Sequence, residues 1–498
     1  MAKLLQIHPN DNVAVAIAPL DDIAPLDDRE SAGNITVRNI IPRGHKVALQ
    51  NIDAGEVIVK YGMPIGLARY PIAPGEYVHV HNIKSLLSGT EEYEYTPSYV
   101  SGSASLSCAP CPMFQGFRRH NGNIGIRNDL WIIPTVGCVN GLARRLAQRI
   151  SQELPSGSVR QALALEHPLG CSQVGEDHER TVQTLASLAS HPNAGGVLIL
   201  SLGCENNTLE SFRQRLDADD PRYRFLKAQN DGDEFEIGIA LLRELRDNAA
   251  PLRRQPVTGL KIGLKCGGSD AFSGITANPL LGMVSDRMTA SGNSIVLTEV
   301  PEMFGAETIL LNRSVDQNVF NKGMQMINNS KNNFLRYGER IDENPSPGNK
   351  EGGISTLAEK SLGCVQKGGT SPVVDVLTYG ERCGKPGLNL LDGPGNDMIA
   401  CTNLAAAGCQ LILFTTGRGT PLGSVIPTLK ISSNSELATA KPHWIDFDAG
   451  RLLSGSSMQK LTEELVQKIA TAASGNELTL NEKNGFQEIV LYKSGVTL

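Results

Sequence analysis

The pattern of hydrophobic and polar positions separates the first part of the chain from the rest. Within residues 1–82, short runs of strand-forming residues such as ITVRNI, VIVKYG and YVHVHN alternate with turns. Two of these turns repeat one another, because IDAGEVI begins at Ile52 and IAPGEYV begins at Ile72. The central Ala-Gly or Pro-Gly pair is typical of a tight turn between strands. No helical period is present, so this part predicts a small all-β domain.

The following segment, residues 83–117, has no hydrophobic period and is rich in Ser, Gly, Thr and Pro. Such a composition predicts a linker. The segment contains one Cys-Ala-Pro-Cys motif, at Cys108 and Cys111. A CxxC pair can bind zinc or do redox chemistry, but a single pair is weak evidence for either. The role of these two cysteines stays open.

From residue 118 onward, strand patterns alternate with amphipathic helix patterns. The strand ending in DLWIIPTVGC precedes the helix GLARRLAQRISQEL, and the strand AGGVLILSLGC precedes the helix EFEIGIALLRELRDNA. A second series begins with LKIGLKCGGSD, after a change of composition near residues 250–258. This alternation predicts a mostly parallel sheet with right-handed crossovers. We expect α/β domains at 118–255 and 256–498; whether they are separate or interlocked stays open.

Composition and charge narrow the classes of function. The chain has 498 residues and a net charge of −6, with no long basic tract, which argues against a nucleic-acid partner. Neither a signal peptide nor an apolar run long enough to span a membrane is present. Ten cysteines in so long a chain fit a reducing compartment. We therefore expect a cytoplasmic enzyme without a membrane partner.

Three Gly-Cys pairs each come at or near the end of a predicted strand. They place a thiol at Cys138, Cys171 and Cys204, and each is followed by an amide. The carboxyl ends of parallel strands border the ligand crevice in open α/β sheets. Three thiols in that position indicate soft metal ligands or thiolate chemistry. The alternative is that they are small buried cysteines, in which case other motifs must carry the function.

Nitrogen and oxygen ligands lie close to these thiols in the sequence. His167 lies four residues before Cys171, and Glu205 follows Cys204 directly. Thiolate together with imidazole suits Fe(II) or Zn, whereas carboxylates alone suit Mg or Ca. No zinc-finger or HExxH spacing is present. The metal hypothesis therefore depends on the convergence of strand ends.

The N-terminal segment offers a second set of chemical groups. In an alternating strand His79 and His81 project from one face, where two imidazoles can share a metal or an anionic substrate. A plain pair of surface histidines is the alternative. His45 and Lys46 follow a glycine turn, from which their side chains can reach a neighbouring cleft. A Lys or His beside a bound carboxylate suits proton abstraction next to that carboxylate.

The last domain contains several polar loops after strands. One loop runs from Lys265 to Asp270, Glu299 and Glu302 flank another strand end, and Cys364 adds a fourth Gly-Cys pair. The segment NPSPGNKEGG at 344–353 is typical of an active-site loop, with a plain surface loop as the alternative.

A glycine-rich turn in the same domain carries Arg418 and suits a carboxylate or phosphate. Neither GxxxxGK[ST] nor a strand-GxGxxG-helix motif is present, which disfavours a nucleotide site.

Motifs along nearly the whole chain resemble the altronate dehydratase family, which includes galactarate dehydratases and sulfolactate lyases. They include IPRGHKVAL, VHVHN, RNDLWIIPTVGCVNG, HPNAGGVLILSLGCENN, CGGSDAFSGITANP, NPSPGNKEGGISTLAEKSLGC, TTGRGTPLG and KSGVTL. The resemblance implies an SAF (β-clip) domain at 1–82, a linker at 83–117, a middle α/β domain and a C-terminal Rossmann-like domain. It implies conversion of D-altronate to 2-dehydro-3-deoxy-D-gluconate in hexuronate breakdown, with a divalent metal, expected to be iron. A homodimer through the middle domain is also implied.

With this reaction in view, the candidate residues receive hypothetical roles. Metal binding is assigned to Cys138, Cys171, Cys204, Glu205 and His167. Proton transfer and other catalytic work are assigned to His45, Lys46, His79, His81 and Lys350. Substrate contacts are assigned to Asn82, Asn140, Gln173, Asn206, Asn349 and Arg418. The metal is expected to be Fe2+, with Mn2+, another divalent ion or an iron–sulfur cluster on the three cysteines as alternatives.

Two other functions stay open at this point. A related lyase acting on galactarate or sulfolactate would have the same metal site and different contacts to the ends of the substrate. Sequence separates such substrates poorly, because one hydroxyl epimer is recognised by a few hydrogen bonds. A non-catalytic sugar-acid binding protein would need the polar loops but not the thiols.

Overall fold

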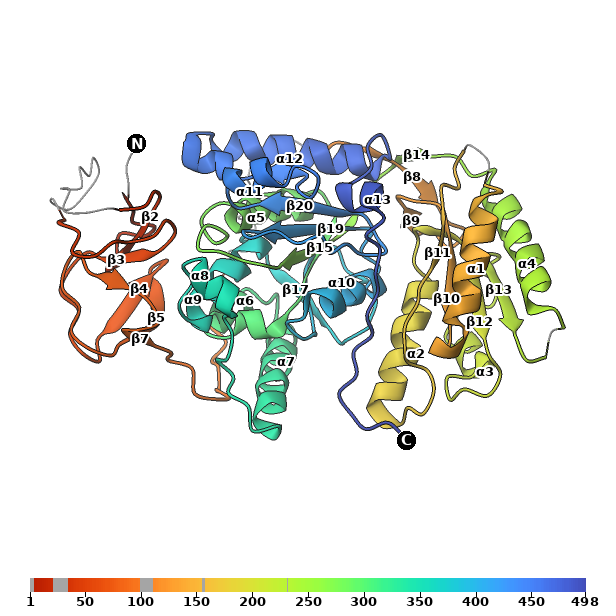
Figure 1. Ribbon diagram of the computed structural model, residues 1–498, viewed down its shortest axis with the longest axis horizontal. Coiled ribbons are helices and arrows are strands. Elements are labelled where there is room, and N and C mark those ends of the chain that lie inside the picture. Colours follow the sequence, from red (N-terminus) through yellow and green to blue (C-terminus); the bar gives the residue numbers. More distant parts are fainter. Residues whose placement is uncertain (1–3, 21–34, 99–110, 155–156, 231) are drawn as a thin grey trace.

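The computed structural model describes residues 4–20, 35–98, 111–154, 157–230 and 232–498. Figure 1 shows three bodies in a row, and their order in space differs from their order in the chain. The N-terminal β module and the middle domain lie on opposite sides of the C-terminal domain. Cys108 lies outside the described residues. Across the described residues no helix is both long and apolar enough to cross a membrane.

Two small antiparallel sheets form the N-terminal module, as the sequence predicts. The strand order of the first is β1-β2-β3-β6 and of the second β4-β5-β7. The repeated turns pair with each other through a bridge between Ile52 and Ile72. Gly55 and Gly75 in these turns have φ of 84° and 83°, a conformation that favours glycine. The strands are β1 (Leu4–Leu5), β2 (Val13–Ala16), β3 (Lys46–Ala48), β4 (Val57–Lys60), β5 (Met63–Ala68), β6 (Tyr77–Val78) and β7 (Ile83–Lys84).

A four-stranded parallel sheet forms the centre of the middle domain, in the order β11-β10-β12-β13. Apolar side chains of α1 and α4 pack on one face, and α2 covers the other. Its strands are β10 (Asp129–Pro134), β11 (Ala162–Ala164), β12 (Ala194–Ser201) and β13 (Tyr223–Lys227). Its helices are η1 (Gly137–Val139), α1 (Asn140–Ser151), α2 (Gly175–Ala189), α3 (Leu209–Arg213) and α4 (Glu234–Ala249).

A small antiparallel sheet connects the middle domain to the rest of the chain. It consists of β14 (Gln255–Val257), β8 (Phe114–Arg118) and β9 (Ile124–Gly125), in that order. Because β8 precedes the middle domain and β14 follows it, their pairing closes that domain into a loop with adjacent ends. The predicted boundaries at residues 82, 117 and 255 stay proposals.

Seven parallel strands form the C-terminal sheet, in the order β17-β18-β16-β15-β19-β20-β21. The strands are β15 (Lys261–Cys266), β16 (Ser294–Leu297), β17 (Val373–Leu377), β18 (Gly387–Leu391), β19 (Leu411–Thr416), β20 (Thr428–Ser432) and β21 (Phe447–Asp448). Strand β15 comes first along the chain among the strands of this sheet, and it lies between β16 and β19. The strand order therefore reverses at β15. A ligand crevice is expected outside the carboxyl ends of strands at such a reversal.

Helices cover both faces of this sheet. They are α5 (Ala277–Ala290), η2 (Val300–Met303), α6 (Glu307–Leu311), α7 (Gln317–Arg336), α8 (Pro347–Glu351), α9 (Leu357–Cys364), η3 (Val365–Gly368), α10 (Asp397–Ala406), α11 (Ser435–Ala440), η4 (Gly450–Ser454), α12 (Met458–Ala473) and α13 (Leu480–Asn484). The expected fold class, a small all-β domain followed by α/β domains with a mostly parallel sheet, is confirmed.

A buried ion-pair cluster holds the N-terminal module on the C-terminal domain. Lys46 of β3 and Lys60 of β4 donate to Glu359 of α9, with Nζ–O distances of 2.8 and 2.7 Å, and all three side chains are at most 1% exposed. Burial opposes ionisation of Glu359, but the two ammonium groups outweigh it and hold its pKa well below the ordinary value. Burial lowers the pKa of Lys46 to about 8. We call Lys46, Lys60 and Glu359 the lysine clamp.

We expect Glu359→Gln to weaken this contact strongly. The substitution leaves two buried ammonium groups without a charged partner, a change that typically costs about 3–5 kcal/mol. The first urea unfolding transition should shift to lower denaturant. Glu436→Gln, which breaks the exposed pair with Arg43, is the matched control and should cost at most about 1 kcal/mol. Equal shifts for the two variants would contradict the role of the clamp.

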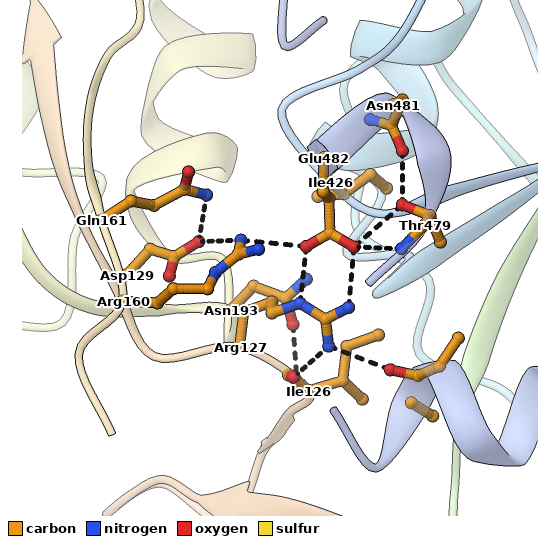
Figure 2. Close-up of polar contacts among 12 residues, drawn as sticks. Ile126, Arg127, Asp129, Arg160, Gln161, Asn193, Ile426, Thr479, Asn481 and Glu482 are labelled. Atoms are coloured by element: carbon orange, nitrogen blue, oxygen red, sulfur yellow. Dashed lines mark hydrogen bonds and ion pairs between the residues drawn. The ribbon is translucent and has the colours of Figure 1, made fainter. Parts of the chain in front are cut away.

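A second buried network joins the middle domain to α13, as Figure 2 shows. Arg127 donates from Nε and Nη2 to the two carboxylate oxygens of Glu482, at 2.7 and 2.8 Å. Arg160 bridges Glu482 and Asp129, at 2.9 and 3.4 Å. Burial opposes ionisation of Glu482, but the hydrogen bonds and charges of the two arginines outweigh it and lower its pKa to about 2. The network therefore stabilises the fold only while Glu482 is ionised.

This network predicts an acid-dependent loss of stability. Because the folded pKa of Glu482 lies below its ordinary value of 4.5, its contribution is full above pH ~4.5 and is lost as pH falls toward ~2. By linkage the contribution is about 3 kcal/mol. Urea unfolding of the parent and of Glu482→Gln from pH 7 to pH 3 should show a stability difference that shrinks below pH ~4.5. A pH-independent difference would contradict this assignment.

Candidate functional site

The carboxyl edge of the C-terminal sheet gathers polar loops from several strands. Cys266 ends β15, Glu302 lies in η2 after β16, and Arg418 follows β19. The segment 344–364, which contains α8 and α9, carries both the predicted active-site loop and Glu359 of the lysine clamp. This edge therefore lies against the N-terminal module.

Cys266, Glu302 and Cys364 meet in the interior of this edge. The sulfur of Cys266 lies 3.3 Å from that of Cys364 and 3.0 Å from Oε2 of Glu302. Within the part of the chain that the structure describes, this is the one group of three or more His, Cys, Asp or Glu side chains that can hold a metal ion. Its ligand atoms all lie within 4.8 Å of one another, and all three residues are buried.

The charges around these three side chains are balanced by buried lysines. Lys360 Nζ lies 2.9 Å from Oε1 of Glu302, and Lys367 Nζ lies 3.9 Å from its Oε2. Burial opposes ionisation of Glu302, but these lysines outweigh it and lower its pKa. A hydrogen bond from the Cys364 thiol lowers the pKa of Cys266 to about 6, and the pKa of Cys364 rises in turn. The hydrogen bond therefore favours the thiolate form of Cys266 over that of Cys364.

The histidines of the N-terminal module form an aromatic cluster around Tyr77. His45 Nδ1 lies 2.6 Å from the Tyr77 hydroxyl, and its Nε2 lies 3.1 Å from the carbonyl oxygen of Glu351 in α8. The ring of His79 lies 4.9 Å from that of His45 and stacks on Tyr77. Burial lowers the pKa of His45 and lowers that of His79 to about 4. Both imidazoles are therefore neutral at pH 7.

The prediction that His79 and His81 project from one face of a strand is wrong. Strand β6 ends at Val78, and residues 79–82 form a turn, so alternation does not apply. His79 is buried, whereas His81 is exposed beside Tyr77, with ring centroids 5.3 Å apart. Asn82 stabilises the turn, because its side chain accepts from the backbone N–H of His79 and donates to the carbonyl of Tyr77.

The predicted active-site loop contacts both domains. Asn349 of α8 accepts from the backbone N–H of the N-cap residue Ser346 and donates to the carbonyl of Ser269, at 2.8 Å, in the loop after β15. Arg418 is 44% exposed and forms an ion pair with Glu351 at 2.9 Å. Lys350 is half-buried in α8. The ammonium group of Lys46 donates to Glu359 in the lysine clamp and to the carbonyl of Gly353. These contacts hold the N-terminal module on the C-terminal domain.

The three predicted thiol ligands lie at the carboxyl ends of neighbouring strands of the middle sheet. Cys138, Cys171 and Cys204 follow β10, β11 and β12, and all three are exposed. They are not the buried core cysteines of the alternative interpretation. Across the described residues they do not form a group with all ligand atoms within 4.8 Å. Their metal binding stays a prediction.

The residues around these thiols are occupied in shaping their loops. Both ring nitrogens of His167 have partners, Pro134 O at 2.8 Å and Leu169 N at 3.2 Å. Glu205 accepts from Thr135, Ser201 and two backbone N–H groups. Two of the three amides connect separate segments: Asn140 donates to the carbonyl of His167, and Asn206 accepts from the backbone N–H of Ser172. Gln173 accepts from the backbone N–H of Gly170 within its own loop.

The structure thus brings the predicted site residues together in two groups rather than one. His45, His79, Lys350, Asn349 and Arg418 lie between the N-terminal module and the C-terminal domain. The three exposed cysteines lie on the middle domain, beyond the C-terminal domain in Figure 1.

No sequence pattern indicates a role for Lys60, Tyr77 or Glu359. For Glu359 one pattern indicates a buried charge: Glu359 and Lys360 are adjacent in the helix LAEKSLGC, whose other residues are apolar or small. Lys60 and Tyr77 lie in ordinary strand patterns, so only their partners in space show what they do.

Comparison with known proteins agrees with this architecture in all three parts of the chain. The SAF domain model of altronate/galactarate dehydratases matches residues 2–86. The model described as D-galactarate dehydratase/altronate hydrolase, second domain, matches 116–250, and that described as D-galactarate/altronate dehydratase, C-terminal, matches 257–497.

Three curated relatives match nearly end to end. The chain is 51% identical to an altronate dehydratase of Bacillus subtilis (strain 168) and 49% identical to one of Escherichia coli (strain K12), each over 100% of both chains. It is 31% identical to a galactarate dehydratase (L-threo-forming) of E. coli (strain K12), over 97% of this chain and 95% of the relative. The expected resemblance is confirmed: this chain belongs to the altronate/galactarate dehydratase family.

Proposed function

We propose that the protein is an altronate dehydratase, a hydro-lyase that converts D-altronate to 2-dehydro-3-deoxy-D-gluconate and water. The observation that carries this proposal is the identity of 51% and 49% to two altronate dehydratases over the full chain, against 31% to a galactarate dehydratase. The cytoplasmic location, the role in hexuronate breakdown and the homodimer stay predictions.

The reaction needs a base, an acid and a means of holding a carboxylate. A base removes the proton on C2, beside the carboxylate, the C3–O bond breaks, and an acid protonates the departing hydroxyl. The resulting enol becomes the 2-keto acid. His45 and His79 suit the proton transfers, because burial keeps both imidazoles neutral at pH 7. Nε2 of His45 faces a carbonyl oxygen and therefore carries the proton, so Nδ1, which accepts from the Tyr77 hydroxyl, is the basic nitrogen. His81 lies at the exposed side of the same cluster.

Arg418 and Lys350 suit the substrate carboxylate. Arg418 is partly exposed and its partner Glu351 is 68% exposed, so a substrate carboxylate can replace Glu351 on the guanidinium. Asn349 and Asn82 fix the loops that carry these groups. A bound divalent ion such as Fe2+ would supply Lewis-acid stabilisation of the developing enediolate. The exposed Cys138, Cys171 and Cys204 stay predicted metal ligands, with an iron–sulfur cluster as the alternative for them. Within one chain they lie across the C-terminal domain from the N-terminal module, so the roles proposed for His45, His79 and Arg418 do not depend on an ion held there.

A substrate panel tests the proposed reaction. The purified chain is supplied anaerobically with Fe2+ and offered D-altronate, galactarate and sulfolactate, and formation of the 2-keto acid is followed. We expect kcat/KM for altronate to exceed that for galactarate at least tenfold, because the relatives with the higher identity are altronate dehydratases. Product from galactarate but none from altronate would refute the assignment.

A variant of His45 tests the base. We expect His45→Gln to lower kcat for altronate about 10²–10⁴-fold without changing thermal unfolding, since it removes a proton-transfer group. The exposed His443→Gln is the matched control and should keep the parent activity.

The pH profile gives a second readout. Because burial lowers the pKa of His45 below 6.5, kcat/KM of the parent should fall with a midpoint below pH 6.5, as His45 gains a proton. A decline with its midpoint above pH 6.5 would contradict the role of His45.

A further inference from the structure

Two sulfur atoms and one carboxylate converge on a point in the interior of the C-terminal domain. Cys266 ends β15, Glu302 lies in η2 and Cys364 ends α9, so three separate elements supply the three groups. Thiolate ligands favour soft or borderline cations such as Fe2+, Co2+ and Zn2+ over Mg2+ and Ca2+. We infer that Cys266, Glu302 and Cys364 form a binding site for a soft divalent cation, distinct from the exposed cysteines of the middle domain. We call it the interior thiolate site.

The charges around this site suit a bound ion. Two thiolates and one carboxylate around a divalent cation carry a net charge of −1. Lys360 lies 2.9 Å from Oε1 of Glu302, on the side away from the sulfur of Cys266, and can offset that charge. Such outer-shell hydrogen bonds orient a ligating carboxylate. Ser269 donates its hydroxyl to the sulfur of Cys266 at 3.3 Å and orients the second ligand.

Three protein ligands leave one coordination position open. Structural zinc sites are closed by four protein ligands, whereas catalytic sites have three and keep a position for water or substrate. A cavity of about 10 Å³ borders Cys364, Lys360 and Ser269. A cavity of that size holds about one water molecule. Lys60 and Glu359 line the same cavity, so it lies between Cys364 and the lysine clamp.

Metal binding by the full-length chain tests this inference without any substrate. The variant Cys138→Ser/Cys171→Ser/Cys204→Ser is stripped of metal anaerobically and loaded with Zn2+ alone, so that the exposed thiols do not contribute. X-ray absorption should show two sulfur neighbours at about 2.3 Å and oxygen neighbours at about 2.0–2.2 Å. Adding Cys266→Ser or Cys364→Ser should weaken Zn2+ binding at least tenfold.

Two further variants separate ligand loss from misfolding. Glu302→Gln preserves the volume of the side chain and should weaken Zn2+ binding. Because it also removes the carboxylate beside the buried Lys360 and Lys367, the far-UV circular dichroism of the metal-free variant is compared with that of the parent to show that the fold is retained. Cys401→Ser removes a buried cysteine of α10 outside the site and should bind as the parent does. No Zn2+ on the triple variant, or equal binding with and without Cys266, would overturn the inference. Failure to turn over altronate would leave this readout unchanged.

Discussion

The contact of one carboxylate with two ammonium groups determines how the molecule is arranged. Glu359 lies between Lys46 and Lys60, and its side chain is almost fully buried. Each of the two lysines comes from a different small sheet of the N-terminal module. A buried charge is costly unless it is paired, so these three groups are tolerated only together. The clamp therefore fixes the position of His45 against α8, and His79 packs on His45.

Helix α9 connects this contact to the chemistry behind it. Within eight residues it presents Glu359 to the N-terminal module, Lys360 to Glu302 and Cys364 to Cys266. A displacement of the N-terminal module would act on α9, and through it on the thiolate and its lysines. The docking contact and the carboxyl edge of the large sheet thus form one continuous polar layer.

The sequence predicts those parts of the fold that depend on local pattern. The repeated turns at Gly55 and Gly75, the alternation of strands and helices, and the position of the three Gly-Cys pairs after strands can all be recognised in the chain. The alternating pattern predicted a strand that includes His79, but β6 ends at Val78, and a hydrophobic pattern does not show where a strand ends.

The sequence also did not show which groups gather in space. Cys266 and Cys364 are separated by 98 positions, so no local spacing reveals them as neighbours. Lys60 resembles any strand lysine until its partner Glu359 is known. Conversely, Cys138 and His45 were expected to serve one site, but Cys138 belongs to the middle domain and His45 to the N-terminal module. Figure 1 shows these two bodies on opposite sides of the C-terminal domain. Pairings of this kind depend on how the domains dock, which hydrophobic periodicity does not encode.

The pairing of β8 with β14 has a consequence for the history of the chain. The middle domain leaves the larger body and returns to it across one short ladder, in which Phe114 faces Val257. A segment whose two ends are neighbours can be gained, exchanged or excised as a cassette without rerouting the host polypeptide. The exposed cysteines Cys138, Cys171 and Cys204 belong to the inserted middle domain, whereas Cys266 and Cys364 belong to the C-terminal domain. The two sets of thiols can therefore change independently in evolution.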